Sequence, residues 1–261
     1  MIGRIAIHIS SKGATSPLRA PFGSFEFFQS VTKPQLFFFL KNILLELEKW
    51  KVKEITIRNF PDLYHTSLSQ KIASVARDWG FSIHTEVDSI IPVTRYSFER
   101  IIKISERQKL RKSRQVFTFS QTKPKKFKQI YLFIKQCRTE RRQSLSMTYP
   151  ALKRVMNVFP DRFYFFEVGN ESETAAAAIV IQVNPEVLYT FYYAHSSRFN
   201  RISPTVMLLA GIYDFAKQRG VKKIDLGTSM LDGRVNRNLF HFKRSVGGVS
   251  NDRLIFKKFL S

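Results

Sequence analysis

YTFYYAHSSRFNRISPTVMLLAGIYDFAKQRGVKKIDLGTS, residues 189–229, is the stretch that decides the fold. Its opening residues complete an apolar, aromatic strand predicted over 187–195. A helix is predicted over 204–219, because Pro204 fits the first turn of a helix, where its missing N–H does no harm. A strand over 223–226 follows. The stretch therefore predicts an α/β (α+β) fold with mixed sheets and helices on both faces.

The same order of elements occurs twice along the chain. Residues 24–93 and 187–258 both read strand, helix, strand, helix, strand. The matching landmarks are the helix-opening prolines Pro34 and Pro204, 170 residues apart, and the strand openings VKEITIR (52–58) and VKKIDLG (221–227), 169 residues apart. This agreement predicts a duplication, with an abbreviated first unit over 1–94 and a second unit over 95–261.

The remaining elements are predicted from periodicity and from turn residues. In the first half we expect strands over 5–9, 24–28, 54–58 and 81–93 and helices over 34–50 and 67–79. In the second half we expect helices over 97–114, 124–142, 149–159 and 234–242 and strands over 116–120, 162–168, 175–183 and 253–259.

Composition excludes several classes of protein. The chain has 261 residues, and 25 Phe, 9 Tyr and 2 Trp supply too much apolar surface for a disordered protein. Cys137 is the only cysteine, which excludes a disulfide scaffold and zinc-finger or iron–sulfur architecture. The five histidines show no metal-ligand spacing, so no metal is expected. We expect a cytoplasmic protein.

Positive charge is concentrated in two segments. The net charge is +23, and residues 95–142 hold 16 Lys and Arg against three acids, while 217–258 hold 11 against three. Such fields predict a phosphate-bearing partner, with tRNA and the surface of an anionic membrane among the candidates. The alternative is a solvated basic face. No transmembrane segment is expected, because the most apolar stretch, 36–47, is short and carries charges.

The second half resembles the acyltransferase half of Fem-type proteins, which belong to the GNAT superfamily and carry two tandem GNAT-like domains. The stretch quoted first, FHFKRSVGG at 240–248 and the basic helix SERQKLRKSRQ at 105–115 carry the resemblance, which extends over 20–258. It implies transfer of an acyl or aminoacyl group to an amine or a hydroxyl. The donor is acyl-CoA in some relatives and aminoacyl-tRNA in others. Both donors are polyanions.

A donor-phosphate site is expected just before the helix at Pro204. The free N–H groups of a helix N-terminus favour a phosphate there, with Ser203 as N-cap and Arg198 and Arg201 adding charge-assisted bonds. The glycine-rich pyrophosphate loop of typical acetyl-CoA enzymes is not present; residues 198–204 occupy its place. The alternative interpretation of Ser203 and Pro204 is a well-made helix start.

Lys243 is the leading catalytic candidate. The resemblance places it at the Fem-type lysine associated with substrate phosphate binding or transition-state charge, where an ammonium can neutralise an oxyanion. Arg244 beside it is a second phosphate ligand. Asp225 ends a strand, where it accepts a proton or orients the acceptor amine. The alternatives are an exposed basic turn for Lys243 and a carboxylate that caps backbone or pairs with arginine for Asp225.

Aromatic residues close the preceding strand. Tyr193 is a candidate general acid and His195 a candidate base, with packing as the alternative for both. On the acceptor side we expect Arg107 and Arg111, spaced to share one helix face with Arg114. Phe22 is a further acceptor-side candidate, in a loop at 20–24 that resembles the opening of the first Fem-type unit.

Three hypotheses follow. The first is an acyl-CoA-dependent acyltransferase acting on an amine of a cell-envelope or polysaccharide precursor, and it is the one we favour. The second is an aminoacyl-tRNA-dependent transferase, which would lose donor affinity steeply with salt. The third is a non-catalytic scaffold that binds RNA or anionic lipid, in which substitution of Lys243 leaves binding unchanged.

Overall fold

The computed structural model describes residues 3–231 and 233–260. The chain divides into unit 1 (Met1–Asp88 and Asn251–Ser261) and unit 2 (Ser89–Ser250). The sequence placed the boundary between residues 94 and 95 and the whole C-terminus in the second unit. The chain passes from one unit to the other within two long strands, β6 (Ser82–Pro92) and β14 (Val249–Phe259).

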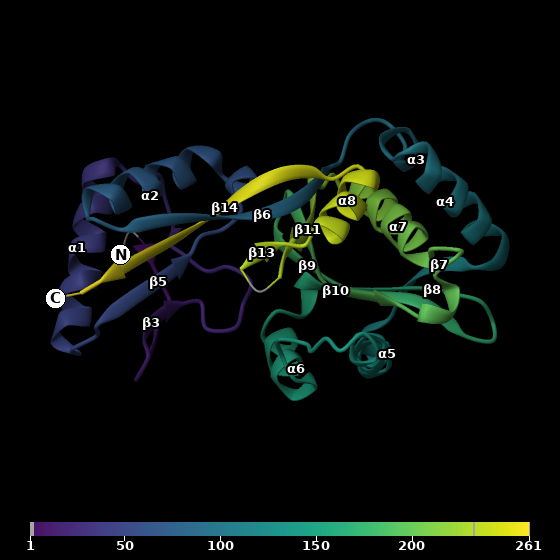
Figure 1. Cartoon of the computed structure of the whole chain (residues 1–261), viewed down its shortest axis with the longest axis horizontal. Helices are drawn as coiled ribbons and strands as arrows, with labels where there is room; N and C mark the ends of the chain where they lie inside the picture. The colour runs from purple at the N-terminus through teal and green to yellow at the C-terminus, as the bar shows by residue number, and fades with distance from the viewer. Residues whose placement is uncertain (1–2, 232, 261) are drawn as a thin grey trace. The chain divides into compact units, whose positions relative to one another are not determined.

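Unit 1 consists of a mixed sheet and two helices (Figure 1). Its further elements are β1 (Gly3–Arg4), β2 (His8–Ser10), β3 (Gly13–Ser16), β4 (Glu26–Phe27), α1 (Lys33–Lys49), β5 (Glu54–Arg58), the 3₁₀ turn η1 (Asp62–Tyr64) and α2 (Thr66–Asp78). β3 runs parallel to β5, and β14 pairs antiparallel with β5 on its other side. One core cluster joins both helices to these strands, with Leu40, Ile57, Ile72 and Phe256 among its members.

Helix α1 begins at a complete capping box. The Thr32 hydroxyl accepts from the backbone N–H of Gln35, and the Gln35 side chain accepts from the Thr32 N–H. These two bonds satisfy two donors at the helix start. Pro34 lies in the first turn, as the sequence predicted.

Unit 2 is a sheet with helices on both faces. Its elements are α3 (Phe98–Ile101), α4 (Ile104–Val116), β7 (Thr118–Thr122), η2 (Pro124–Lys126), α5 (Phe127–Glu140), α6 (Tyr149–Val158), η3 (Pro160–Arg162), β8 (Phe163–Gly169), β9 (Thr174–Asn184), β10 (Val187–His195), η4 (Ser197–Phe199), α7 (Pro204–Gln218), β11 (Lys223–Thr228), β12 (Met230–Leu231), β13 (Arg234–Val235) and α8 (Arg237–Ser245). The strand order is β6-β11-β10-β9-β8-β7. One core cluster lies on the α7 side of the sheet and another on the α5 side.

The predicted repeat is present with a different first strand. The strand predicted over 24–28 was expected to be the first strand of the repeat, and this is wrong. Within the described residues, Glu26 and Phe27 pair with β1 in a separate two-stranded ribbon. β3 takes its place: β3, α1 and β5 correspond to β10, α7 and β11, and both strand pairs are parallel. The sequence of β3, GATS, carries too little hydrophobic signal to be recognised.

Three other expectations need correction. The basic helix expected over 97–114 is two helices, interrupted where buried Ile102 turns inward. Of the strand expected over 5–9, only residues 8 and 9 are in a strand, as part of β2, and residues 5–7 are not. The helix expected from 234 begins at Arg237, after Asn236 caps it through the N–H of Leu239. In the described part of the chain, no helix is long and apolar enough to cross a membrane.

Candidate active site

Strands β10 and β11 separate in the middle of unit 2. Their parallel pairing extends only from Val187 opposite Lys223 to Tyr189 opposite Asp225. At that point the Thr190 hydroxyl donates a hydrogen bond to the Asp225 carbonyl at 2.9 Å. A side-chain hydrogen bond therefore links the two strands where the backbone hydrogen bonds between them end. β10 also shifts register against β9 between Tyr189 and Tyr192. A bulge of this kind bends a strand, and it does so here where the ladder with β11 stops.

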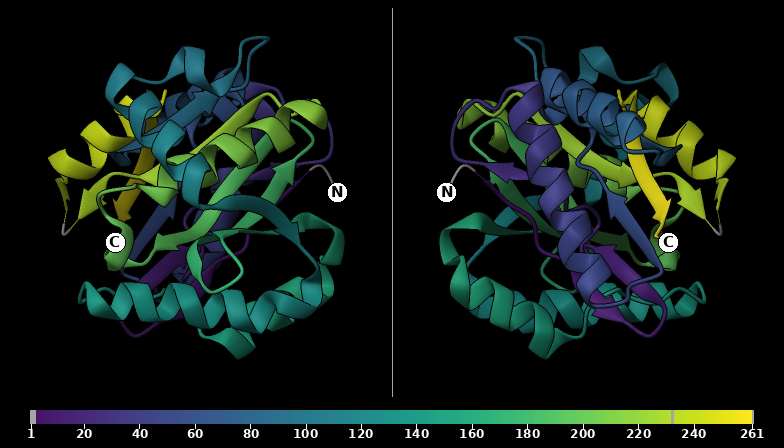
Figure 2. Two further views of the ribbon diagram at one scale, coloured as in Figure 1. Left: turned by 90° about the vertical axis from the view of Figure 1, so that its right-hand side faces the viewer. Right: turned by 90° about the vertical axis from the view of Figure 1, so that its left-hand side faces the viewer.

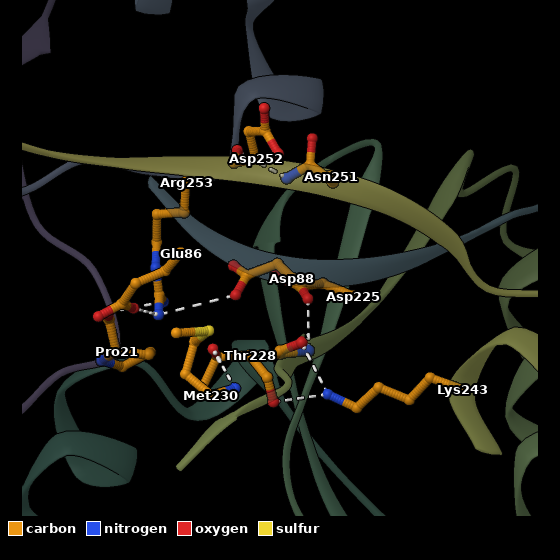
Figure 3. A network of polar contacts seen from close by, with 11 residues as sticks. Pro21, Glu86, Asp88, Asp225, Thr228, Met230, Lys243, Asn251, Asp252 and Arg253 are labelled. Carbon is orange, nitrogen blue, oxygen red and sulfur yellow. Dashed lines mark hydrogen bonds and ion pairs between the residues drawn. The ribbon is translucent and has the colours of Figure 1, made fainter. Parts of the chain in front are cut away.

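The end of β11 is held by two buried charged side chains (Figure 3). The Asp225 carboxylate accepts from the Gly227 N–H at 2.6 Å. The Lys243 Nζ donates to the carbonyls of Gly227 and Thr228 at 2.8 and 2.7 Å. Gly227 has φ of +72°, a conformation that favours glycine. The two side chains therefore fix the turn at the mouth of the β10–β11 opening.

Lys243 lies on α8, and its side chain is buried, with 1% of the residue exposed. The alternative interpretation, in which Lys243 belongs to an exposed basic turn, is therefore wrong. Arg244, the next residue, is exposed. Because neighbouring helix residues point in different directions, α8 directs Lys243 to the turn and Arg244 to solvent.

His195 ends β10 and contacts the start of α7. Its Nδ1 lies 2.8 Å from the Thr205 hydroxyl, and its Nε2 lies 2.9 Å from Asn200 Oδ1 and 3.0 Å from Arg141 Nη2. Burial lowers the pKa of His195, and the charge of Arg141 lowers it further, against the raising effect of the Asn200 bond. The imidazole is thus held largely neutral and ties β10 to the first turn of α7.

Ser203 does not cap α7 through its side chain. It occupies the N-cap position with φ of +54°, and its hydroxyl makes no capping bond. Its N–H donates to the carbonyl of Phe199, as does the N–H of Ile202. The expected supply of free backbone donors before Pro204 is therefore reduced, since a tight series of turns uses these N–H groups.

The two arginines before α7 lie in different surroundings. Arg198 is 73% exposed on its side chain and forms an ion pair with Glu173 at 2.8 Å. Arg201 is exposed, and no ion pair involves it within residues 3–231 and 233–260. Arg201 is therefore the more available of the two for an anionic ligand.

Tyr193 lies on β10 and packs against the core cluster of α7. Burial raises its pKa to about 12, and the charge of Asp225 contributes in the same direction, opposed by Arg138. The hydroxyl therefore keeps its proton through the physiological pH range.

The predicted acceptor-side residues do not lie on the β10–β11 opening elements. Arg107 is half-buried on α4 and donates from Nε to the Ile102 carbonyl at 3.3 Å. Arg111 is exposed on the same helix. Phe22 belongs to unit 1, where its ring lies 5.4 Å from that of Tyr64 in an edge-to-face contact.

Sequence reasoning missed Thr190, Thr205 and Arg141. Thr190 ends the ladder, and Thr205 and Arg141 contact His195. A polar residue within the aromatic run YTFYY was the one available signal for Thr190. For Arg141, which follows α5, the sequence offers none, because its contact depends on the packing of α5 on the sheet.

A metal centre finds no support in the described residues, which contain no cluster of three His, Cys, Asp or Glu side chains suited to an ion. Cys137 is buried on α5, and burial raises the pKa of its thiol. It packs as a small apolar residue, as expected from its place in a helix.

Comparison with known proteins identifies the family of this chain. A model described as an acetyltransferase (GNAT) domain matches residues 105–244. The chain belongs to this family. Its enzymatic class is accordingly that of the GNAT N-acyltransferases. The matched segment contains β10, α7, β11 and Lys243, so it includes the whole opening.

Solved structures show the same fold over nearly the whole chain. The crystal structure of FemX superposes with a TM-score of 0.70 at 12% identity, covering 98% of this chain and 88% of that one. The C-terminal domain of a putative lysylphosphatidylglycerol synthetase from Agrobacterium fabrum gives 0.69 at 11% identity, covering 98% and 81%. A tandem GNAT protein from the clavulanic acid biosynthesis pathway gives 0.57 at 9%, covering 100% and 79%. The resemblance to Fem-type proteins and the tandem GNAT-like fold are thereby confirmed. A comparison with curated proteins gave no match.

Proposed function

We propose that the chain transfers an acyl group from acyl-CoA to an amine of a cell-envelope or polysaccharide precursor. The divergence of β10 from β11 after three ladder pairs is the observation that carries the proposal. It supplies an extended opening within one sheet, edged by strand backbone and by the start of α7. We infer that the acyl thioester lies along this opening, with the exposed Arg201, three residues before α7, supplying positive charge for the phosphates of the donor.

Transfer replaces a C–S bond by a C–N bond. The acceptor amine attacks the thioester carbonyl, and the oxyanion collapses with cleavage of the C–S bond. The amine gives up its proton to solvent, the CoA thiolate leaves and takes up a proton, and the group that protonates it is re-protonated from solvent. A Tyr193 hydroxyl that keeps its proton to about pH 12 can donate it to the departing thiolate. Lys243 and Asp225 act on this site through the Gly227–Thr228 turn that they hold.

Calorimetric titration of coenzyme A and acetyl-CoA at physiological salt tests the proposal. We expect saturable one-to-one binding, weakened by about three- to tenfold in Arg201→Ala, the loss of one charge-assisted contact. Arg237→Ala, which removes an exposed arginine at the start of α8, is the matched control and should bind as the unmodified chain does. No heat, or equal weakening by both substitutions, contradicts the proposal.

An aminoacyl-tRNA donor is the second candidate. It is favoured by the 16 Lys and Arg against three acids in residues 95–142 and by the similarity to FemX and to the lysylphosphatidylglycerol synthetase domain. The two donors differ in salt response, because neutralised phosphates release counterions and make affinity fall steeply with the logarithm of salt concentration. Saturable binding of aminoacyl-tRNA in the absence of any acetyl-CoA binding would favour this candidate.

A further inference from the structure

Helix α1 of unit 1 is apolar on two sides. Leu36, Leu40, Leu44 and Leu47 form its buried side and pack into the core of unit 1. Phe37, Phe38 and Leu45 are exposed, Phe38 to 65%. A helix of a water-soluble domain needs one apolar side only. Packing in the core of unit 1 therefore does not account for the apolar residues on the second side of α1.

A groove continues this exposed side onto the end of β14. It has a volume of about 480 Å³, and its lining includes Lys41 and Leu45 of α1, Trp79 at the end of α2, and Lys258 and Phe259 of β14. Phe259 is 71% exposed. In the right-hand view of Figure 2, α1 lies on the side toward the viewer. We call Phe37, Phe38, Leu45, Phe259, Lys41 and Lys258 the α1 patch.

The α1 patch contains two lysines and no acidic residue. Three other lysines of unit 1 are paired, Lys33 with Asp78, Lys49 with Glu46 and Lys257 with Glu54. Lys51 and Lys53 form no ion pair in the described part of the chain and add to the positive charge of unit 1. Over the residues that the structure describes, Lys41 and Lys258 form no ion pair, and the one carboxylate in the groove lining is that of Glu48.

This combination fits a lipid surface better than a protein partner. Lysine is depleted in the buried centres of protein interfaces. At a bilayer surface, phenylalanine and leucine enter the boundary between headgroups and acyl chains, while lysines extend to the phosphates. Exposed aromatic rings beside unneutralised lysines are therefore the pattern expected of an interfacial helix.

We propose that the α1 patch binds the surface of an anionic phospholipid bilayer. Phe38, Leu45 and Phe259 enter the headgroup region, and Lys41 and Lys258 contact lipid phosphates. The proposal concerns unit 1 alone and does not depend on the donor used in unit 2. It also gives a role to the most apolar stretch of the sequence, which the acyltransfer reaction does not use.

Co-sedimentation of the full chain with vesicles tests this proposal. The chain should bind phosphatidylcholine vesicles that contain about one third phosphatidylglycerol more tightly than pure phosphatidylcholine vesicles. Phe38→Ser with Phe259→Ser should weaken binding to the anionic vesicles by at least about tenfold, since two aromatic rings lose their burial. Lys41→Glu with Lys258→Glu should weaken it by about tenfold or more, and the effect should shrink at high salt.

A matched pair in unit 2 serves as the control. Phe159 is 55% exposed and Lys153 is exposed on the nearby α6, so Phe159→Ser with Lys153→Glu makes the same chemical changes elsewhere. This control should bind vesicles as the unmodified chain does, and circular dichroism should show that all variants are folded. Equal binding to neutral and anionic vesicles, or an equal loss in the control, overturns the proposal. The proposal is also overturned if the unmodified chain is a dimer in solution and the α1 patch variants are monomers. The α1 patch would then be an interface between two copies of the chain.

Discussion

At the scale of single residues, Lys243 shows how burial assigns a role. Its Nζ donates to two backbone carbonyls at 2.8 and 2.7 Å, which makes it a positioning residue for the Gly227–Thr228 turn. Lys243→Met should lower the free energy of unfolding by about 2–4 kcal/mol, because two buried carbonyls lose their donor. Urea unfolding measures this. Arg244→Met, an exposed neighbour on α8, should change stability by less than about 0.5 kcal/mol. Equal effects of the two substitutions would show that Lys243 does not hold the turn.

His195 gives a prediction for pH at the same scale. Burial lowers its pKa in the folded state below the ordinary value of 6.5, so the unfolded chain binds the proton more readily. The neutral His195 side chain contributes fully to the free energy of unfolding above about pH 6.5, the ordinary pKa of histidine. This contribution is lost as the pH falls toward the lower pKa that His195 has in the folded state. Between about pH 7.5 and 5.5, His195→Gln should therefore lose less stability than the unmodified chain. His241→Gln, at an exposed position, should keep the full loss. An unchanged pH dependence in His195→Gln would rule out this role.

At the scale of elements, the end of β11 depends on a left-handed glycine beside a tyrosine. A Cβ on Gly227 would lie 3.3 Å from Tyr189 Oη, whereas a Cβ on Gly220, which also has positive φ, would meet nothing within 4 Å. Gly220→Ala should cost about 1 kcal/mol for the backbone conformation alone. Gly227→Ala should cost about 1 kcal/mol more, because Tyr189 must move, and it should also weaken acetyl-CoA binding. Thermal unfolding of both variants measures the difference, and equal costs would show that the contact with Tyr189 is unimportant.

Elements with strong periodicity were predictable from the sequence, and those stabilised by distant partners were not. The ranges expected for β5 and β10 agree residue for residue with the structure. In β5, polar residues alternate with buried isoleucines, and β10 is a nearly continuous apolar and aromatic run. β3 was missed, since its short GATS segment is a strand only because it pairs with β5. Of the residues predicted for the site, Asp225 and Lys243 meet at one turn in the structure. The burial of Lys243 and the absence of a capping bond from the Ser203 side chain were not predictable, because they depend on how α8 and the turns at 198–203 fold.

At the scale of the whole molecule, the net charge of +23 should act on the rate of donor capture. A field of this sign attracts a polyanionic donor and is screened by salt. In stopped-flow measurements, the association rate of acetyl-CoA should fall by roughly tenfold between about 0.05 and 0.5 M NaCl, while the dissociation rate changes little. The opposite result, a constant association rate with a dissociation rate that rises steeply with salt, would contradict this prediction. It would mean that salt weakens the bound complex and does not slow donor capture.

The location of the donor is the central claim, and hydrogen–deuterium exchange with and without acetyl-CoA tests it most directly. The account predicts slower exchange in three segments of unit 2: the end of β10 at 190–195, the start of α7 at 201–206 and the end of β11 at 226–229. Protection confined to the basic segment 95–142, or no change anywhere, would contradict a donor site between β10 and β11.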